Sequence, residues 1–168
     1  MTLLKKLLSA ALMLGIIACN GVENQKSPAP KNQIAEIDKV RLADLSGQPI
    51  DLRKYAGKTI FINFWATWCQ PCIAEMPFIN NAQEILKNEP VLFFLASAET
   101  EDEIKTFQNA NNFNFQYVMI KNLEELNIQA LPTTLIFNPK GELAYSQQGV
   151  RKWNDKQHIG LILKIISN

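Results

Sequence analysis

Hydrophobic and polar positions follow two periods along this 168-residue chain, and together they predict a domain of alternating strands and helices. Nearly continuous apolar runs rich in aromatic and β-branched residues are typical of strands buried on both faces, and they occur at 58–65 and 90–97. Apolar residues at helical spacing predict helices at 70–88, at 100–111 and from about residue 154 to the end.

Shorter patterns fill the rest of the domain. Alternating segments around Gly47 predict a small N-terminal β-hairpin, and 115–120 predicts a further strand. Segment 122–128 is a short helical candidate, and 132–149 predicts two strands joined by the turn Asn138–Gly141. This order predicts an α/β domain with a central mixed β-sheet and helices on both faces.

Two local signals refine the predicted helices. Thr100 is followed three residues later by Glu103, a capping-box pattern that predicts a helix start. Pro77 falls inside the helix 70–88, where a proline predicts a kink.

The N-terminal segment reads as a targeting sequence. Lys5 and Lys6 precede an apolar run at 7–17 that is too short to span a bilayer comfortably, so residues 1–18 are expected to be a secretory signal peptide. The ending "IIAC" resembles the lipobox of bacterial lipoproteins, which implies cleavage before Cys19 and a lipid on its sulfur. The alternatives are a plain cleaved signal, or an uncleaved anchor with an inert Cys19.

The segment that follows is polar and carries two prolines. Residues 19–34 are therefore expected to be the lipidated cysteine and a flexible tether, and 35–168 the folded domain. The expected location is the bacterial cell envelope, with the domain lipid-anchored and facing the periplasm or exterior.

Composition limits the function classes. Apolar residues make up 47% and charged residues 20%, as in ordinary globular proteins, and the formal net charge is +1. There is no basic patch or run of like charge in the sequence, so nucleic acid is not expected as a partner.

Cys69 and Cys72 carry the candidate chemistry. They lie three residues apart where a strand gives way to a helix, with Pro71 suited to the first helical turn. The helix N-terminus lowers the pKa of a thiol there, so Cys69 is expected to be the accessible nucleophile. Cys72 lies one turn deeper and is expected to resolve the mixed disulfide.

The cysteine pair has three alternative interpretations. A purely structural disulfide would close a very small loop and stabilise the fold little. Zinc needs four ligands, which the chain does not supply besides this pair. A copper-binding or metallochaperone module would need His158, the single histidine, as its third ligand.

The stretch "FWATWCQPCIAEMP" together with "LPTT" resembles the thioredoxin superfamily, and more narrowly the membrane-anchored thiol-disulfide oxidoreductases of the TlpA/ResA type. The resemblance runs from about residue 37 to the C-terminus and implies a thioredoxin-like fold with a central βα insertion at 99–120. It implies that Trp68, Gln70 and Pro71 surround the cysteines. It also implies that Pro132, after Leu131, is a cis-proline that receives the substrate backbone.

Two further positions follow from the resemblance. Glu75 is implied to lie near the active site and to modulate the thiols. Ordinary thioredoxins keep a buried aspartate where this chain has Asn63, and our hypothesis is that Glu75 replaces it. The alternative for Glu75 is a solvated helix residue. The neutral Gln70 favours a reductase, because strong oxidases of the superfamily place a histidine there.

The expected function is therefore extracytoplasmic disulfide exchange with protein clients, as a reductase serving cytochrome c maturation or a similar clientele. A membrane electron donor of the thiol-reducing type would recycle the dithiol, and neither a metal nor an organic cofactor is implied. A peroxidase of the same superfamily is disfavoured, because it would use a lone cysteine in a different setting.

Overall fold

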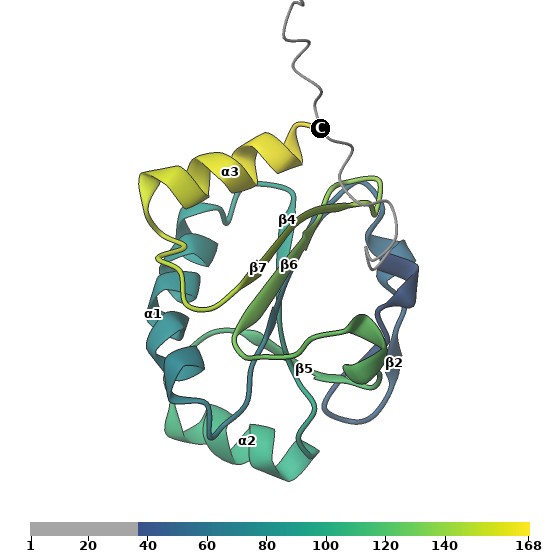
Figure 1. The fold of residues 1–168 in the computed structure, drawn as a ribbon, viewed down its shortest axis with the longest axis vertical. Helices are drawn as coiled ribbons and strands as arrows, with labels where there is room; N and C mark the ends of the chain where they lie inside the picture. The colour runs from purple at the N-terminus through teal and green to yellow at the C-terminus, as the bar shows by residue number, and fades with distance from the viewer. Residues whose placement is uncertain (1–36) are drawn as a thin grey trace, which may run out of the picture. The chain divides into compact units, whose positions relative to one another are not determined.

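A computed structural model describes residues 37–168 (Figure 1). The predicted signal peptide at 1–18, the lipidation site Cys19 and the tether at 19–34 lie outside the described residues, so these expectations stay predictions. Within 37–168, none of the helices has the length and apolar character needed to cross a membrane.

The centre of the domain is a seven-stranded mixed sheet in the order β2-β1-β5-β4-β3-β6-β7. The three strands β3, β4 and β5 are parallel, and every other pairing is antiparallel. The strands are β1 (Leu42–Ala43), β2 (Pro49–Ile50), β3 (Thr59–Phe64), β4 (Val91–Ser97), β5 (Gln116–Ile120), β6 (Thr133–Phe137) and β7 (Leu143–Gln148). The predicted mixed sheet, N-terminal hairpin and βα insertion (α2 and β5) are confirmed.

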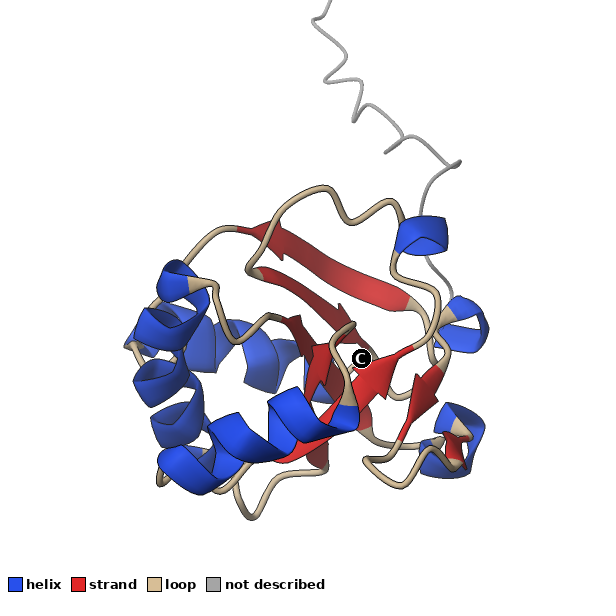
Figure 2. Cartoon of the chain, turned by 90° about the horizontal axis from the view of Figure 1, so that it is seen from below, coloured by secondary structure: helices blue, strands red, loops and turns tan. Residues whose placement is uncertain are grey.

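The three α-helices, α1 (Gln70–Ile85), α2 (Glu101–Ala110) and α3 (Lys156–Ile166), pack on the same face of the sheet (Figure 2). The crossovers β3-α1-β4 and β4-α2-β5 step through the sheet in one direction, so right-handed connections place both helices on one side. The opposite face carries the short 3₁₀ helices η1 (Ile37–Lys39), η2 (Leu52–Tyr55) and η3 (Glu124–Leu126). Helical segments thus cover both faces, as predicted, but all the α-helices share one.

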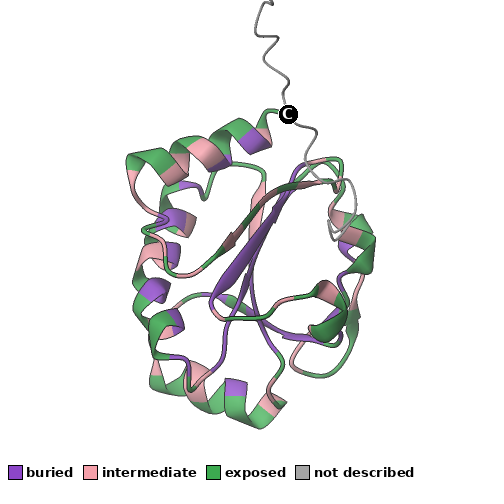
Figure 3. Ribbon diagram, viewed as in Figure 1, coloured by how far each residue is buried: buried purple, intermediate pink, exposed green. Residues whose placement is uncertain are grey.

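Alternate residues of the interior strand β3 face two separate apolar clusters. Phe61 packs on the α-helical side, while Ile60, Ile62 and Phe64 pack on the 3₁₀ side. All six residues of β3 are buried (Figure 3). The edge strand β7 instead alternates between exposed and half-buried positions. The strand leading into the cysteine pair is therefore buried on both faces, as is its neighbour β6.

Several local predictions are confirmed. Thr100 and Glu103 form a reciprocal capping box at the start of α2. Pro77 lies inside α1, as predicted, while the kink expected there stays a prediction; the helix continues to Ile85 and ends slightly before the predicted boundary. The turn Asn138–Gly141 joins β6 to β7, with the amide of Gly141 donating to the carbonyl of Asn138 at 2.9 Å.

Candidate active site

Cys69 and Cys72 form a disulfide at the point where β3 passes into α1, with 5.3 Å between their Cα atoms. Cys69 is the N-cap of the helix, and its Sγ accepts a hydrogen bond of 3.3 Å from the amide of Cys72. Pro71 lies in the first helical turn, where its missing N–H costs nothing. The sulfur of Cys69 therefore faces the N–H groups and the positive end of the helix dipole.

The exposure of the two cysteines corrects one part of the sequence reasoning. The sequence predicts an accessible nucleophile and a covered partner, yet Cys69 is only 4% exposed and Cys72 1%. The cap geometry turns the Cys69 side chain inward over the first turn. The exposed residues are its neighbours Trp68, which is 71% exposed, Gln70 and Pro71. Helix position, and not depth, distinguishes the two thiols.

The peptide bond between Leu131 and Pro132 is cis, as the resemblance implied. Pro132 is buried and Leu131 is half-buried. The next residue, Thr133, starts β6 and is paired with Phe64 at the end of β3. This register places the cis-proline at the end of β3 where the chain leaves the sheet toward the cysteines.

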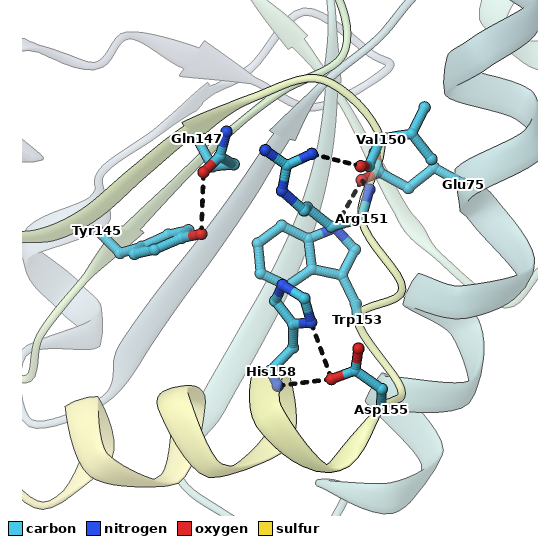
Figure 4. A network of polar contacts seen from close by, with 8 residues as sticks. All are labelled: Glu75, Tyr145, Gln147, Val150, Arg151, Trp153, Asp155 and His158. Carbon is cyan, nitrogen blue, oxygen red and sulfur yellow. Dashed lines mark hydrogen bonds and ion pairs between the residues drawn. The ribbon is translucent and has the colours of Figure 1, made fainter.

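Glu75 is fully buried, so the alternative of a solvated helix residue is wrong. Its Oε1 accepts hydrogen bonds from the amide of Arg151 at 2.7 Å and from Nε1 of Trp153 at 2.8 Å (Figure 4). Its Oε2 accepts from Nδ2 of Asn63 at 3.0 Å. Burial raises the pKa of the Glu75 carboxyl, and these donors oppose that rise. Asn63 also donates to Oγ1 of Thr134 at 2.9 Å, which links Glu75 to strand β6.

The loop from Gly149 to Trp153, in the C-terminal part of the domain, contacts both the cis-proline and Glu75. The amide of Gly149 donates to the carbonyl of Pro132 at 2.8 Å, which ties this loop to the cis-proline. Sequence reasoning missed Arg151 and Trp153, because nothing in the local pattern marks residues that reach Glu75 from more than seventy positions away.

His158 lies apart from the cysteines. Its ring packs edge-on against Trp153 with 5.1 Å between ring centroids, and its Nδ1 lies 2.9 Å from Oδ1 of Asp155 (Figure 4). Among residues 37–168, no group of three histidine, cysteine or acidic side chains is placed to hold a metal ion. The described residues therefore do not bring His158 to Cys69 and Cys72 as the copper alternative required.

Comparisons with known proteins agree with this geometry. The family model described as Redoxin matches residues 24–160. Thiol-disulfide oxidoreductase ResA of Bacillus subtilis is 32% identical over 106 residues, which are 61% of this chain and 59% of that protein. ResA of Halalkalibacterium halodurans is 35% identical over 112 residues, 64% of each chain. ResA of Bacillus thuringiensis strain Al Hakam is 30% identical over 128 residues, 74% of this chain and 73% of that one. The match thus spans less than two thirds of the first two relatives.

Solved structures share the fold at lower identity. A thiol:disulfide interchange protein of the thioredoxin family from Chlorobium tepidum has a TM-score of 0.65 at 20% identity, covering 76% of this chain and 93% of that one. StoA from Bacillus subtilis has a TM-score of 0.59 at 21% identity, covering 72% and 93%.

The fold and the site together define a thioredoxin-fold protein with a disulfide-forming CxxC pair at a helix N-terminus and a cis-proline at the same end of the sheet. The chain belongs to the redoxin family. Its similarity to ResA proteins confirms the predicted resemblance to the TlpA/ResA type.

Proposed function

We propose that this protein is a thiol-disulfide oxidoreductase that exchanges disulfides with protein clients through Cys69 and Cys72. The observation that carries the proposal is the Cys69–Cys72 disulfide at the N-terminus of α1, with the cis-proline Pro132 at the same end of the sheet. The ResA relatives are named for the same reaction class.

In the reducing direction, the Cys69 thiolate attacks one sulfur of a client disulfide and the other client sulfur leaves as a thiolate. Cys72 then loses its proton and attacks Sγ of Cys69, which releases the second client thiol and forms the Cys69–Cys72 disulfide. Two electrons pass from the dithiol to the client. An extended client segment pairs with the backbone next to Pro132, in the way that an added β-strand pairs with a sheet.

Glu75 has a defined part in this cycle. It follows Cys72 by three residues on α1, so both side chains lie on one face of the helix. Burial raises the pKa of Glu75, which makes its carboxyl a better proton acceptor than an exposed carboxylate, and Glu75 is the group that accepts the proton of Cys72. Asn63 cannot take this part, because an amide does not titrate.

The proposal also covers the direction of electron flow, the electron donor and the location of the protein. The direction is reductive, with client cysteines kept reduced for cytochrome c maturation or a similar process, and a membrane donor of the thiol-reducing type recycles the disulfide. The neutral Gln70 supports this direction, and the sequence "IIAC" supports a lipid anchor at Cys19 in the bacterial envelope. The dithiol itself does the chemistry, without a bound cofactor.

The first experiment is the reduction potential of the Cys69–Cys72 pair, measured on the full chain in detergent by tryptophan fluorescence across thiol buffers. A value below the cytosolic glutathione range of about −220 to −260 mV supports a reductase. A value above about −180 mV makes the protein an oxidase or isomerase. No reversible disulfide at all overturns the redox function.

A trapping experiment tests the roles of the two thiols. The variant Cys72→Ser is expected to accumulate a mixed disulfide between Cys69 and the client, because the resolving thiol is missing. The matched variant Cys69→Ser is expected to trap none. Equal trapping by both variants would contradict the assignment.

A further inference from the structure

Glu99 lies in the loop between β4 and α2 and binds the segment that leads into Cys69. Its Oε2 accepts a hydrogen bond of 2.8 Å from the amide of Thr67, and its Oε1 accepts one of 2.6 Å from the Thr67 hydroxyl. The hydroxyl of Ser97, a fully buried residue at the end of β4, donates to Oε2 at 2.9 Å. One carboxylate thus gathers three donors and joins the cysteine loop to the sheet.

Residues 65–69, which lead into α1, make few other hydrogen bonds with the rest of the fold. The amide of Trp65 donates to the carbonyl of Ala96 at 3.1 Å, and the Trp65 ring packs against Phe107 of α2. The amide of Cys69, two residues past Thr67, donates to the carbonyl of Ala66 at 3.0 Å, which is a contact within the same loop. Between these points Thr67 is half-buried and its neighbour Trp68 is exposed. The Glu99 carboxylate therefore holds the loop between its last buried residue and the helix cap.

This contact matters most when the disulfide is open. In the oxidised protein the bond to Cys72 fixes Cys69 covalently. In the dithiol form, the position of the Cys69 sulfur over the first turn of α1 depends on the loop before it. A thiolate gains from the helix N-terminus only within the first turn, so a small displacement of the loop weakens the effect.

We propose that Glu99 is a positioning residue for Cys69, and that its bonds to Thr67 keep the reduced thiol at the N-terminus of α1. The inference rests on the proposed assignment of Cys69 as the nucleophile. Two opposite effects of the carboxylate must be separated. Its hydrogen bonds lower the pKa of the Cys69 thiol through position, whereas its negative charge alone would raise that pKa.

Two substitutions separate position from charge. In Glu99→Gln, the amide oxygen can still accept from the Thr67 amide and the Ser97 hydroxyl, while the amide NH₂ donates to the Thr67 hydroxyl. The clamp is kept and the charge is lost. In Glu99→Ala, both are lost. Asp102→Asn is the matched control, because it removes an exposed charge from the first turn of α2 while the hydrogen bonds of Thr67 to Glu99 stay in place.

The test is the pH profile of alkylation of Cys69 by iodoacetamide in the reduced full-length protein, with the labelled cysteine identified by mass spectrometry. We expect Glu99→Ala to raise the apparent pKa of Cys69 and to slow its alkylation at pH 7 by roughly threefold or more. Glu99→Gln is expected to restore a rate at least equal to that of the wild type, and Asp102→Asn to leave it unchanged. A merely structural role for Glu99 would lower stability without moving this profile.

Other results would overturn the inference. If Glu99→Ala and Glu99→Gln both lower the pKa of Cys69, charge outweighs position; if the Glu99→Ala profile matches the wild type, the clamp has no role. If Glu99→Ala does not fold, Thr67→Val carries the test, because it removes only the hydroxyl bond and is expected to slow alkylation in the same way. Faster alkylation of Cys72 than of Cys69 in the wild type would instead refute the nucleophile assignment, and this inference with it.

Discussion

The indole Nε1 of Trp153 donates a hydrogen bond of 2.8 Å to Oε1 of Glu75, from a residue 78 positions further along the chain. Both side chains are fully buried. Trp153 is itself enclosed by aromatic rings, with 4.9 Å between its centroid and that of Phe61. The carboxylate next to the cysteine pair is therefore oriented by a rigid side chain from the C-terminal part of the domain.

Trp153→Phe is expected to destabilise the fold by about 1–3 kcal/mol, because it removes a donor from a buried carboxylate and leaves a small cavity. The measurement is urea unfolding at pH 7. The same substitution in a Glu75→Gln background is the control, since a hydrogen bond to a neutral acceptor is weaker. Equal losses in the two backgrounds would show that only the cavity matters.

Glu75 is expected to make the stability of the protein pH-dependent. Burial raises its pKa in the folded state above the ordinary value of 4.5, so the folded protein binds the proton more tightly than the unfolded chain does. The free energy of unfolding must then fall as pH rises through the window that begins near 4.5 and ends at the folded pKa.

Unfolding measured across this window, wild type against Glu75→Gln, isolates the contribution. The amide introduced by this substitution cannot titrate, so the decline assigned to Glu75 should be absent from the variant. Parallel curves for the two proteins would mean that the pKa of Glu75 is not raised in the folded state.

Gly141 is expected to resist substitution more than other turn glycines. Its φ is +78°, and a Cβ there would lie 2.7 Å from Cγ2 of Ile37. Gly141→Ala should therefore cost more than the roughly 1–2 kcal/mol of a left-handed backbone alone. Gly47→Ala is the matched control, because Gly47 has a φ of +84° with open space around it. A loss in thermal stability no larger than that of Gly47→Ala would contradict the steric argument.

Tyr117→Phe is expected to leave stability unchanged or to raise it by up to about 1 kcal/mol. The Tyr117 hydroxyl is buried and has no hydrogen-bond partner among the described residues, and burial raises the pKa of this phenol. The ring packs among Trp65, Phe107 and Phe115, which phenylalanine would preserve. Calorimetry checks this, and a clear loss of stability would reveal a bond that the hydroxyl makes.

Sequence alone was sufficient where the signal is local. The capping box at Thr100, the turn at Asn138–Gly141 and the buried strand β3 each depend on residues a few positions apart. The cis-proline was predicted only because its motif is shared with a known family.

Contacts between residues far apart in the chain could not be predicted from the sequence. Trp153 and Arg151 reach Glu75 across the whole domain, and Glu99 reaches Thr67 across α1 and β4. Their side chains carry no periodic pattern that would mark them. The placement of α1 and α2 on one face also follows from strand order, which element prediction leaves open, and α3 packs on the same face after the last strand.

The residues that complete the arrangement around Glu75 are synthesised after the cysteine pair, so the site is assembled late. Cys69 and Cys72 leave the ribosome long before Pro132, Arg151 and Trp153. Until the last of these emerges, the pair lacks its cis-proline or its oriented carboxylate. A nascent or C-terminally truncated chain therefore has both cysteines but lacks the bonds that orient Glu75, and the complete site forms only when the C-terminal part of the domain is present.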